Sequence, residues 1–256
     1  MLEAMGLSRH FGARVALDQL NLSVRAGEIF CLLGANGAGK TTTIKLFLGF
    51  LAPTAGSVRV AGIDVALDPI GSRRKLLYIP EQIALYGELT GLENLEYFAA
   101  LAGVEDCSTA RLHACLLEAG LPEDAVRQRA AGYSKGMRQK VGISLALAKN
   151  ARAMLLDEPT SGLDPQASAE FHDLLCRQRD AGSAILMATH DLFRAREVGT
   201  HIGLMREGKL RRTIRAEEVT ARELEALYLE EMGLEEMGRD PAPIAAPPAR
   251  TGLGTR

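Results

Sequence analysis

The segment Gly34-Ala35-Asn36-Gly37-Ala38-Gly39-Lys40-Thr41 fits the pattern G-x-x-x-x-G-K-[ST], and it constrains the fold of this 256-residue chain more than any other feature. The apolar run EIFCLL, residues 28–33, precedes it as a buried strand would, and a helical stretch follows over residues 41–51. Glycines let such a loop turn tightly, so that backbone N–H groups converge on phosphate oxygens at the positive end of a helix. The loop therefore predicts nucleotide binding through Gly34, Asn36, Gly37, Ala38, Gly39, Lys40, Thr41 and Thr42. Lys40 is expected to reach the β- and γ-phosphates, and the Thr41 hydroxyl to bind Mg²⁺.

Two acidic residues, Asp157 and Glu158, follow a second apolar strand over residues 153–156. Successive residues at a strand end point in different directions, so Asp157 can face a metal ion while Glu158 faces the terminal phosphate. Taken alone, the pattern is more typical of a solvated strand end. The phosphate loop upstream favours a functional pair, in which an Asp holds Mg²⁺ and a second residue positions the attacking water.

Short apolar strands alternate with helices along the chain, which predicts an α/β fold: a P-loop NTPase core with a mostly parallel sheet covered by helices. Residues 1–25 indicate two strands joined by a turn, and so an N-terminal antiparallel β subdomain. Helical periodicity over residues 90–121 predicts a helical lobe that spans residues 82–132. Further strands are expected at residues 56–62, 76–79, 184–188, 202–205 and 209–213, and further helices at 134–150, 165–181 and 216–233. One domain should therefore occupy residues 1–238, followed by a proline-rich, disordered tail over 239–256.

Composition narrows the functional classes. No apolar run approaches the roughly 20 residues needed to cross a bilayer, and charged residues interrupt the N-terminal segment MLEAMGLSRHF, which therefore does not resemble a signal peptide. The formal net charge of −2 provides no basic field for nucleic acid. The four cysteines form no C-x-x-C pair and are expected to be reduced thiols. We therefore expect a cytoplasmic protein that acts on membranes, if at all, through a partner.

The motifs occur in an order that resembles the ABC-type ATPases over roughly residues 1–215. After the phosphate loop come the segments YSKGMRQ at 133–139, LLDEPTSGLDP at 155–165 and THD at 189–191. The middle two segments are the most diagnostic, since GTPases and kinases do not carry them. The resemblance implies an ATP-hydrolysing subunit of a transporter, bound to the inner face of the membrane through a separate integral membrane permease. It also implies a homodimer in which ATP lies between two subunits.

The resemblance also implies a role for individual residues. Phe11 takes the place of the aromatic residue that stacks on adenine, although an ordinary core phenylalanine is the alternative. Ser134 and Gly136 match the signature that contacts the γ-phosphate held by the opposite subunit, consistent with a serine-capped helix start as an anion site. Glu158 and His190 match the catalytic glutamate and the switch histidine. Asp164 matches the loop that signals across the dimer.

Two positions depart from the family pattern. Lys135 replaces the first glycine of the signature, and a cation at a positive helix end is disfavoured unless the triphosphate lies nearby. Glu81 occupies the place of the glutamine that contacts Mg²⁺ or water after Pro80, with Gln82 following it. Either residue could serve there; Glu81 is assigned as a Mg²⁺ ligand with Thr41 and Asp157. Both departures resemble the bacterial exporter branch that has separate permease chains.

Other functions are compatible with parts of the pattern. An importer subunit would share all of these motifs. ABC proteins that act on ribosomes or DNA carry two ATPase domains or a long coiled coil, whereas this chain has one phosphate loop and no long heptad run. A regulatory protein that binds nucleotide without turnover is disfavoured because Asp157, Glu158 and His190 are all present.

Overall fold

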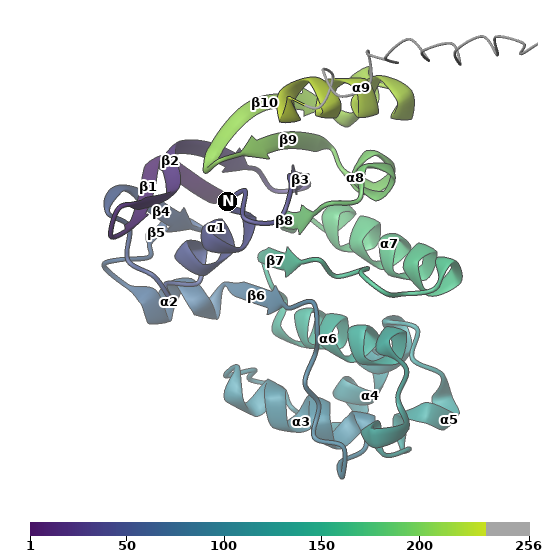
Figure 1. The fold of residues 1–256 in the computed structure, drawn as a ribbon. Helices are drawn as coiled ribbons and strands as arrows, with labels where there is room; N and C mark the ends of the chain where they lie inside the picture. Colours follow the sequence, from purple (N-terminus) through teal and green to yellow (C-terminus); the bar gives the residue numbers. More distant parts are fainter. Residues whose placement is uncertain (234–256) are drawn as a thin grey trace, which may run out of the picture.

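A computed structural model describes residues 1–233 of the chain and contains two sheets and a helical lobe (Figure 1). The predicted tail at 239–256 lies outside the described residues. The larger sheet has the order β10-β9-β3-β8-β7-β6, and its strands are parallel except for the antiparallel β9–β10 pair. Its members are β3 (Ile29–Leu33), β6 (Leu76–Ile79), β7 (Ala153–Asp157), β8 (Ala184–Thr189), β9 (His201–Arg206) and β10 (Lys209–Arg215). The smaller sheet, in the order β2-β1-β4-β5, is antiparallel and contains β1 (Leu2–Phe11), β2 (Arg14–Val24), β4 (Ala55–Val60) and β5 (Ile63–Asp64).

The predicted fold class is confirmed, because strands buried on both faces alternate strictly between two cores. Phe30 and Leu32 of β3 enter the core shared with the antiparallel sheet and α1 (Lys40–Phe47). Ile29, Cys31 and Leu33 enter the core on the opposite face. That face is covered by α6 (Lys135–Lys149), α7 (Pro165–Asp180), α8 (Leu192–Val198) and α9 (Ala221–Met232). Alternation with a period of two on a fully apolar strand is the pattern expected for a parallel sheet between two layers.

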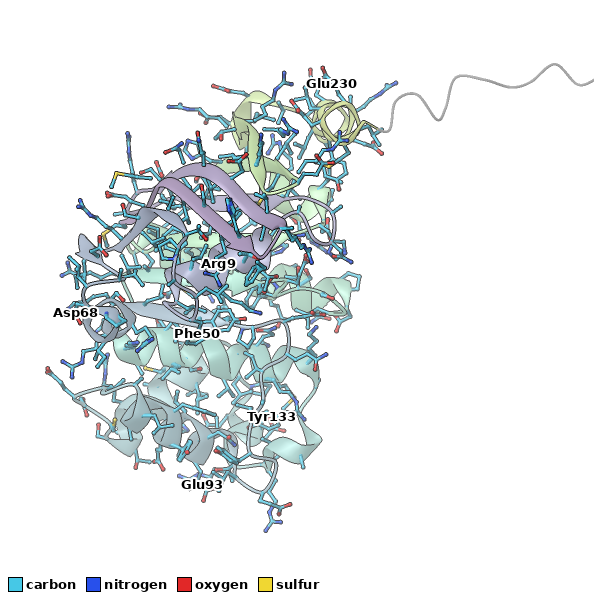
Figure 2. The ribbon with its side chains drawn as sticks, turned by 60° about the vertical axis from the view of Figure 1, so that its left-hand side comes forward. Arg9, Phe50, Asp68, Glu93, Tyr133 and Glu230 are labelled. Atoms are coloured by element: carbon cyan, nitrogen blue, oxygen red, sulfur yellow. The ribbon has the colours of Figure 1, made fainter. Side chains whose placement is uncertain are left out.

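The helical lobe contains α3 (Gly91–Leu101), α4 (Thr109–Glu118) and α5 (Glu123–Val126), which pack with one face of α6, from Met137 to Ala148, around their own core. Thr90 and Glu93 form a capping box at the start of α3, and so satisfy backbone donors that the helix itself cannot. Tyr133, labelled within the lobe in Figure 2, donates a buried hydrogen bond of 2.6 Å to the carbonyl oxygen of Ala125. The lobe therefore follows β6 in the chain and returns to the main sheet through α6.

Several boundaries differ from those predicted. Helix α1 ends at Phe47, not at residue 51, because Gly49 adopts a φ of 66°. The C-terminal helix α9 begins at Ala221, and residues 216–218 form a separate 3₁₀ turn. Helix α2 (Pro69–Arg74) was not predicted; Asp68, labelled in Figure 2, caps it by accepting a hydrogen bond from the Gly71 N–H. No helix among residues 1–233 combines the length and the apolar character that crossing a bilayer requires.

Candidate functional site: the phosphate loop and two strand ends

The phosphate loop connects β3 to α1 and depends on glycine at two points. Gly39, at the start of α1, has a φ of 112°, which residues with a side chain rarely adopt. A Cβ on Gly34 would overlap the carbonyl oxygen of Met205 on β9 and lie 2.9 Å from the Cβ of Ala38. The loop can therefore fold against β9 only because Gly34 has no side chain.

Hydrogen bonds from outside the loop fix its position. The Gly208 N–H, in the β9–β10 turn, donates to the carbonyl of Ala38 at 2.9 Å, and the Asp18 N–H of β2 donates to Gly208 at 3.0 Å. The Thr43 hydroxyl donates to the Gly39 carbonyl at 3.0 Å. Because these bonds use carbonyl oxygens of the loop, its N–H groups are not the groups that anchor it.

The Lys40 side chain curls back into the loop. Its Nζ donates a hydrogen bond of 2.6 Å to the carbonyl of Gly34 and lies 3.7 Å from Oε1 of Glu158, and the side chain is 6% exposed. Burial lowers the pKa of Lys40, while the negative charges of Glu158 and Asp157 oppose that shift. The ammonium group thus lies in a site that already contains carboxylates, and an anionic ligand would add a further partner for it.

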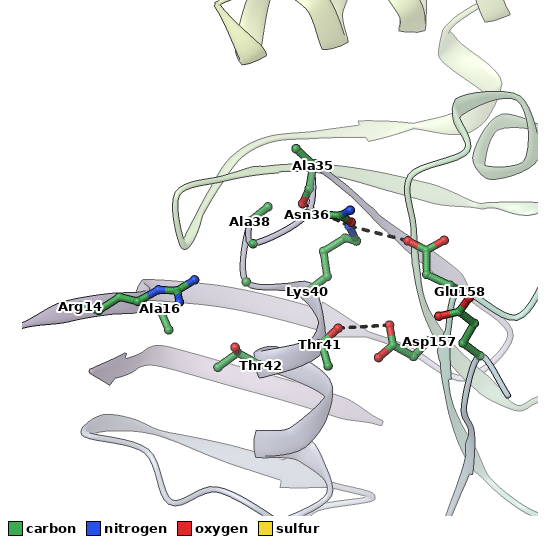
Figure 3. A pocket seen from close by; sticks show the side chains of 13 residues that line it. Arg14, Ala16, Ala35, Asn36, Ala38, Lys40, Thr41, Thr42, Asp157 and Glu158 are labelled. Carbon is green, nitrogen blue, oxygen red and sulfur yellow. Dashed lines mark hydrogen bonds and ion pairs between the residues drawn. The ribbon is translucent and has the colours of Figure 1, made fainter. Parts of the chain in front are cut away.

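Asp157 lies at the end of β7 within reach of the phosphate loop. The Thr41 hydroxyl donates to Oδ1 of Asp157 at 3.4 Å (Figure 3). Burial raises the pKa of Asp157; the Thr41 hydrogen bond opposes this shift, and the charges of Glu158 and Glu81 add to it. Burial and the neighbouring carboxylates disfavour the charged form of Asp157, and a bound cation would stabilise it. Hydroxyl and carboxylate oxygens are the hard ligands that Mg²⁺ prefers.

The Thr41 hydroxyl and the Asp157 carboxylate suit Mg²⁺ better than they suit a metal ion whose ligands all come from the protein. Within residues 1–233, no group of three or more His, Cys, Asp or Glu side chains could hold a metal ion. Mg²⁺ usually takes only one or two carboxylates and completes its shell with water and substrate phosphates. Thr41 and Asp157 therefore have the chemistry of a Mg²⁺ site that the phosphates of a nucleotide would complete.

Glu158 occupies an uncommon backbone conformation that directs its carboxylate toward the neighbouring strand end. Its φ is 47°, and its N–H donates to the carbonyl of Ala188 on β8 at 2.9 Å. Oε2 of Glu158 lies 2.9 Å from Nδ1 of His190, and the His190 N–H donates to the same oxygen at 3.4 Å. An ionised carboxylate only accepts hydrogen bonds, so a hydrogen bond between Glu158 and His190 requires a proton on Nδ1 of His190. Nε2 is then the ring nitrogen that does not contact Glu158.

The loop and the strand end enclose a cavity of about 240 Å³ (Figure 3). Its walls are formed by Arg14, Ala16, Ala35, Asn36, Gly37, Ala38, Gly39, Lys40, Thr41, Thr42, Glu81, Asp157 and Glu158. Glu81 lines this cavity, whereas Gln82 lines a separate apolar groove. Of the two residues that could follow Pro80 into the site, the structure thus brings Glu81 to it.

The predicted signature residues lie at the start of α6, outside the walls of this cavity. Ser134 caps the helix by accepting a hydrogen bond from the Met137 N–H at 3.2 Å, as predicted. A Cβ on Gly136 would lie 3.2 Å from that of Ala167, so α6 and α7 approach closely here. Lys135 donates a hydrogen bond to the carbonyl of Ser161, so its charge has a partner within the chain.

Two other predicted residues also lie away from the cavity walls. Phe11 is 44% exposed at the end of β1, and the guanidinium of Arg9, labelled in Figure 2, lies 4.5 Å from the centre of its ring. The alternative of an ordinary core phenylalanine does not hold for so exposed a ring. Asp164 caps α7 by accepting from the Ala167 N–H at 2.9 Å.

The sequence did not point to Arg14 or Ser161. Arg14 begins β2 and lines the cavity, although the phosphate loop begins only at Gly34, 20 residues later in the chain. Ser161 donates from Oγ to Oε1 of Glu81 at 3.2 Å. Ser161 lies within the segment LLDEPTSGLDP, but the sequence does not predict the contact of either residue at the site, because each contact joins segments that are distant in the chain.

Comparison with known proteins places this arrangement in a family. The family model described as "ABC transporter" matches residues 17–161. The doxorubicin resistance ATP-binding protein DrrA of Mycobacterium tuberculosis is 37% identical over 197 residues, which cover 77% of this chain and 60% of DrrA. The match thus spans less than two thirds of that relative.

Two solved structures are similar over most of their length. One, an ATP-binding subunit of an ABC transporter, has a TM-score of 0.75 at 32% identity, with 91% of this chain and 94% of that chain covered. The other, a dimeric post-hydrolysis state of the ATP-binding cassette MJ0796 bound to ADP and Pi, has a TM-score of 0.74 at 27% identity, with 84% and 99% covered. Because the family model matches more than half of its residues, the chain belongs to the ABC transporter family, as an ATP-binding domain.

Proposed function

We propose that this chain is the Mg²⁺-dependent ATP-hydrolysing subunit of an exporter, and that it drives a separate membrane permease from the cytoplasmic side. The observation that carries the proposal is the convergence of Lys40, Asp157 and Glu158 on one cavity beneath the phosphate loop. The backbone of residues 34–39 and the Lys40 ammonium would hold the phosphates. Thr41, Asp157 and Glu81 would hold Mg²⁺, which when bound neutralises phosphate charge.

The chemistry of hydrolysis is assigned to Glu158 and His190. Glu158 is 16% exposed and accepts from His190 through Oε2, while Oε1 faces Lys40 at 3.7 Å. When a phosphate draws Lys40 away, Oε1 becomes available to accept a hydrogen bond from a water molecule and to orient it for attack. His190, 62% exposed, would present Nε2 to the terminal phosphate.

ATP is proposed to lie between two copies of the chain. Ser134 and Gly136 lie outside the cavity walls, and in the proposed dimer they would contribute to the site of the second copy. The N–H groups at the start of α6 make that end an anion site, as a signature facing a phosphate requires. Phe11 would stack on the adenine of the bound ATP, and Asp164 would signal across the dimer. The dimeric, ADP- and Pi-bound relative supports the arrangement.

A permease helix is proposed to dock in the apolar groove between β6 and the helical lobe. The groove, about 300 Å³, is lined mostly by apolar residues: Leu77, Tyr78, Pro80, Gln82, Ile83, Ala84, Leu85, Leu95, Phe98, Val141, Gly142 and Leu145. Beside it, the partly exposed rings of Tyr86 and Tyr97 pack edge to face at 5.0 Å. Export is supported by the name of DrrA, which refers to doxorubicin resistance.

Phosphate release by the purified chain tests the enzymatic part of the proposal. Lys40→Ala should abolish Mg²⁺-dependent release, whereas Lys45→Ala, on the exposed face of the same helix, should not. Equal rates for the two variants would contradict the proposed role of the loop.

The membrane partner is tested by co-purification: Phe98→Asp should release the chain from membranes. Co-sedimentation of the wild type with ribosomes and not with membranes would contradict transport.

A further inference from the structure

Ser161 lies in the turn that links β7 to α7, three residues after Glu158. The Ser161 N–H donates to the Glu158 carbonyl at 3.2 Å, and the Leu163 N–H donates to the Thr160 carbonyl at 3.1 Å. Gln139 of α6 donates to the Pro159 carbonyl at 2.8 Å from a buried position. The turn is therefore a fixed extension of the strand that carries Glu158.

Ser161 contacts both positions at which the chain departs from the family pattern. Its hydroxyl donates to Oε1 of Glu81 at 3.2 Å, across 80 residues of sequence. Its carbonyl accepts from Nζ of Lys135, across 26 residues. Glu81, at the glutamine position, and Lys135, at the signature glycine, thus both contact Ser161. The sequence alone does not predict that these two positions are joined in this way.

The contact with Lys135 fixes the backbone of Ser161. Lys135 is the first residue of α6, where a positive charge is disfavoured by the helix dipole. The Ser161 carbonyl accepts a hydrogen bond from that charge and so offsets the cost, and the lysine in turn restrains the turn. Nζ also lies close to Gly162, which has a φ of 67°.

The contact with Glu81 acts at the wall of the cavity. Glu81 and Asp157 both line it, and Glu81 contributes to raising the pKa of Asp157. A carboxylate side chain at the surface turns freely unless a donor holds one of its oxygens. The Ser161 hydroxyl donates to Oε1 of Glu81 and so restrains the carboxylate. Oε2 of Glu81 receives no hydrogen bond from Ser161.

We propose that Ser161 is a positioning residue, which orients the Glu81 carboxylate toward the cation site and is itself held by Lys135. This inference rests on the proposed Mg²⁺-ATP function. It predicts that loss of the Ser161 hydroxyl weakens the Mg²⁺ dependence of nucleotide binding more than it affects the fold. The same loss should leave nucleotide binding without Mg²⁺ unchanged.

The test is a Mg²⁺ titration of the binding of a fluorescent ATP analogue to the full chain. Ser161→Ala should raise the half-saturating Mg²⁺ concentration roughly two- to tenfold, the range expected for the net contribution of one typical hydrogen bond. Ser161→Thr, which keeps the hydroxyl, should stay close to the wild type. Ser108→Ala, an exposed serine in the lobe whose side chain does not cap its helix, is the matched control.

A double-mutant cycle separates positioning from general damage. In a Glu81→Ala background, Ser161→Ala should produce no further shift, because the carboxylate that it orients is gone. Fully additive shifts, or a Ser161→Ala titration that matches the wild type, would overturn the inference. If the wild type itself shows no Mg²⁺-dependent nucleotide binding, the proposed function fails instead. Should Ser161→Ala fold poorly, Lys135→Met removes the hydrogen bond that holds the Ser161 backbone. It is expected to shift the Mg²⁺ titration in the same direction.

Discussion

The carboxylate of Glu158 meets the imidazole of His190 at 2.9 Å, Oε2 to Nδ1, across the ends of two adjacent parallel strands. Parallel neighbours bring their carboxyl ends to the same sheet edge, so residues 32 positions apart become partners. The left-handed backbone of Glu158, with a φ of 47°, directs the side chain to that edge. Backbone strain of this kind at a site is usually associated with function.

Glu158→Gln should retain ATP binding and reduce turnover at least about 100-fold, because an amide cannot accept a proton or polarise water as a carboxylate does. The slow variant should then accumulate as an ATP-bound dimer. Phosphate release and gel filtration with and without ATP measure the two effects. Glu225→Gln, an exposed position on α9, is the control. Turnover close to that of the wild type would refute the assignment of Glu158.

Mixing two inactive variants tests whether each site is shared between subunits. Lys40→Ala damages the phosphate loop, and Gly136→Asp places a carboxylate against the phosphate of the opposite subunit. In a mixed dimer, the intact signature of one chain meets the intact loop of the other. Random mixing makes about half of the dimers mixed, so independent shared sites should restore roughly a quarter of wild-type activity.

The control for that experiment carries both substitutions in one chain and is mixed with wild type. If sites are shared, both sites of each mixed dimer are damaged, and only wild-type homodimers contribute, roughly a quarter of full activity. If sites lie within single chains, mixed dimers keep one site and the total rises to about half. No recovery in the first mixture combined with this higher value in the control would exclude shared sites.

His172 should make the stability of the protein depend on pH. It is buried between α7 and α8 with Nδ1 3.3 Å from Oε2 of Glu197, and burial lowers its pKa. Glu197 and Asp191 oppose that shift, whereas Arg194 adds to it. The unfolded chain therefore binds more protons than the folded one below the ordinary value of 6.5, and stability falls as the pH drops through that range.

Urea unfolding at about pH 7.5 and about pH 5.5 measures this effect. His172→Gln should lose less unfolding free energy between the two pH values than the wild type does, whatever its stability at the higher pH. His10→Gln, at an exposed position on β1, should show the wild-type difference. An unchanged difference in His172→Gln would show that this imidazole does not contribute.

Gly34→Ala should destabilise the fold by about 2 kcal/mol or more, because the added methyl group would overlap the Met205 carbonyl and separate the loop from β9. Gly132→Ala is the matched control, since a Cβ there meets no atom within 4 Å. Thermal unfolding of both variants measures the difference. Equal melting temperatures would mean that β9 shifts to accommodate the methyl group without loss of stability.

The sequence predicts those parts of the fold that depend on local pattern. The strand at β3 was recognisable because all its side chains are apolar and a glycine-rich loop follows it. Ser134 was predicted as a helix cap, and it is one. Helices α2 and α8 were missed because each is short, although Asp68 and Asp191 cap them.

Interactions that depend on strand order could not be predicted. The place of Glu81 directly after Pro80 favoured it for the site but left Gln82 open, and only the folded chain shows Glu81 at the cavity and Gln82 in the apolar groove. The hydrogen bond from Lys135 to the Ser161 carbonyl was likewise not predicted. Such contacts follow from the packing of α6 against the turn after β7, which only the assembled fold defines.

The place of β3 within the larger sheet has a consequence for how the protein is made. This strand, which leads into the phosphate loop, ends at Leu33, yet its two neighbours are β8 and β9, which begin at Ala184 and His201. A ribosome adding about 5–20 residues per second needs on the order of 10–30 s to synthesise the intervening stretch. Throughout that interval, the most apolar strand of the nascent chain has neither of its partners, so early protection by a chaperone would matter most for this segment.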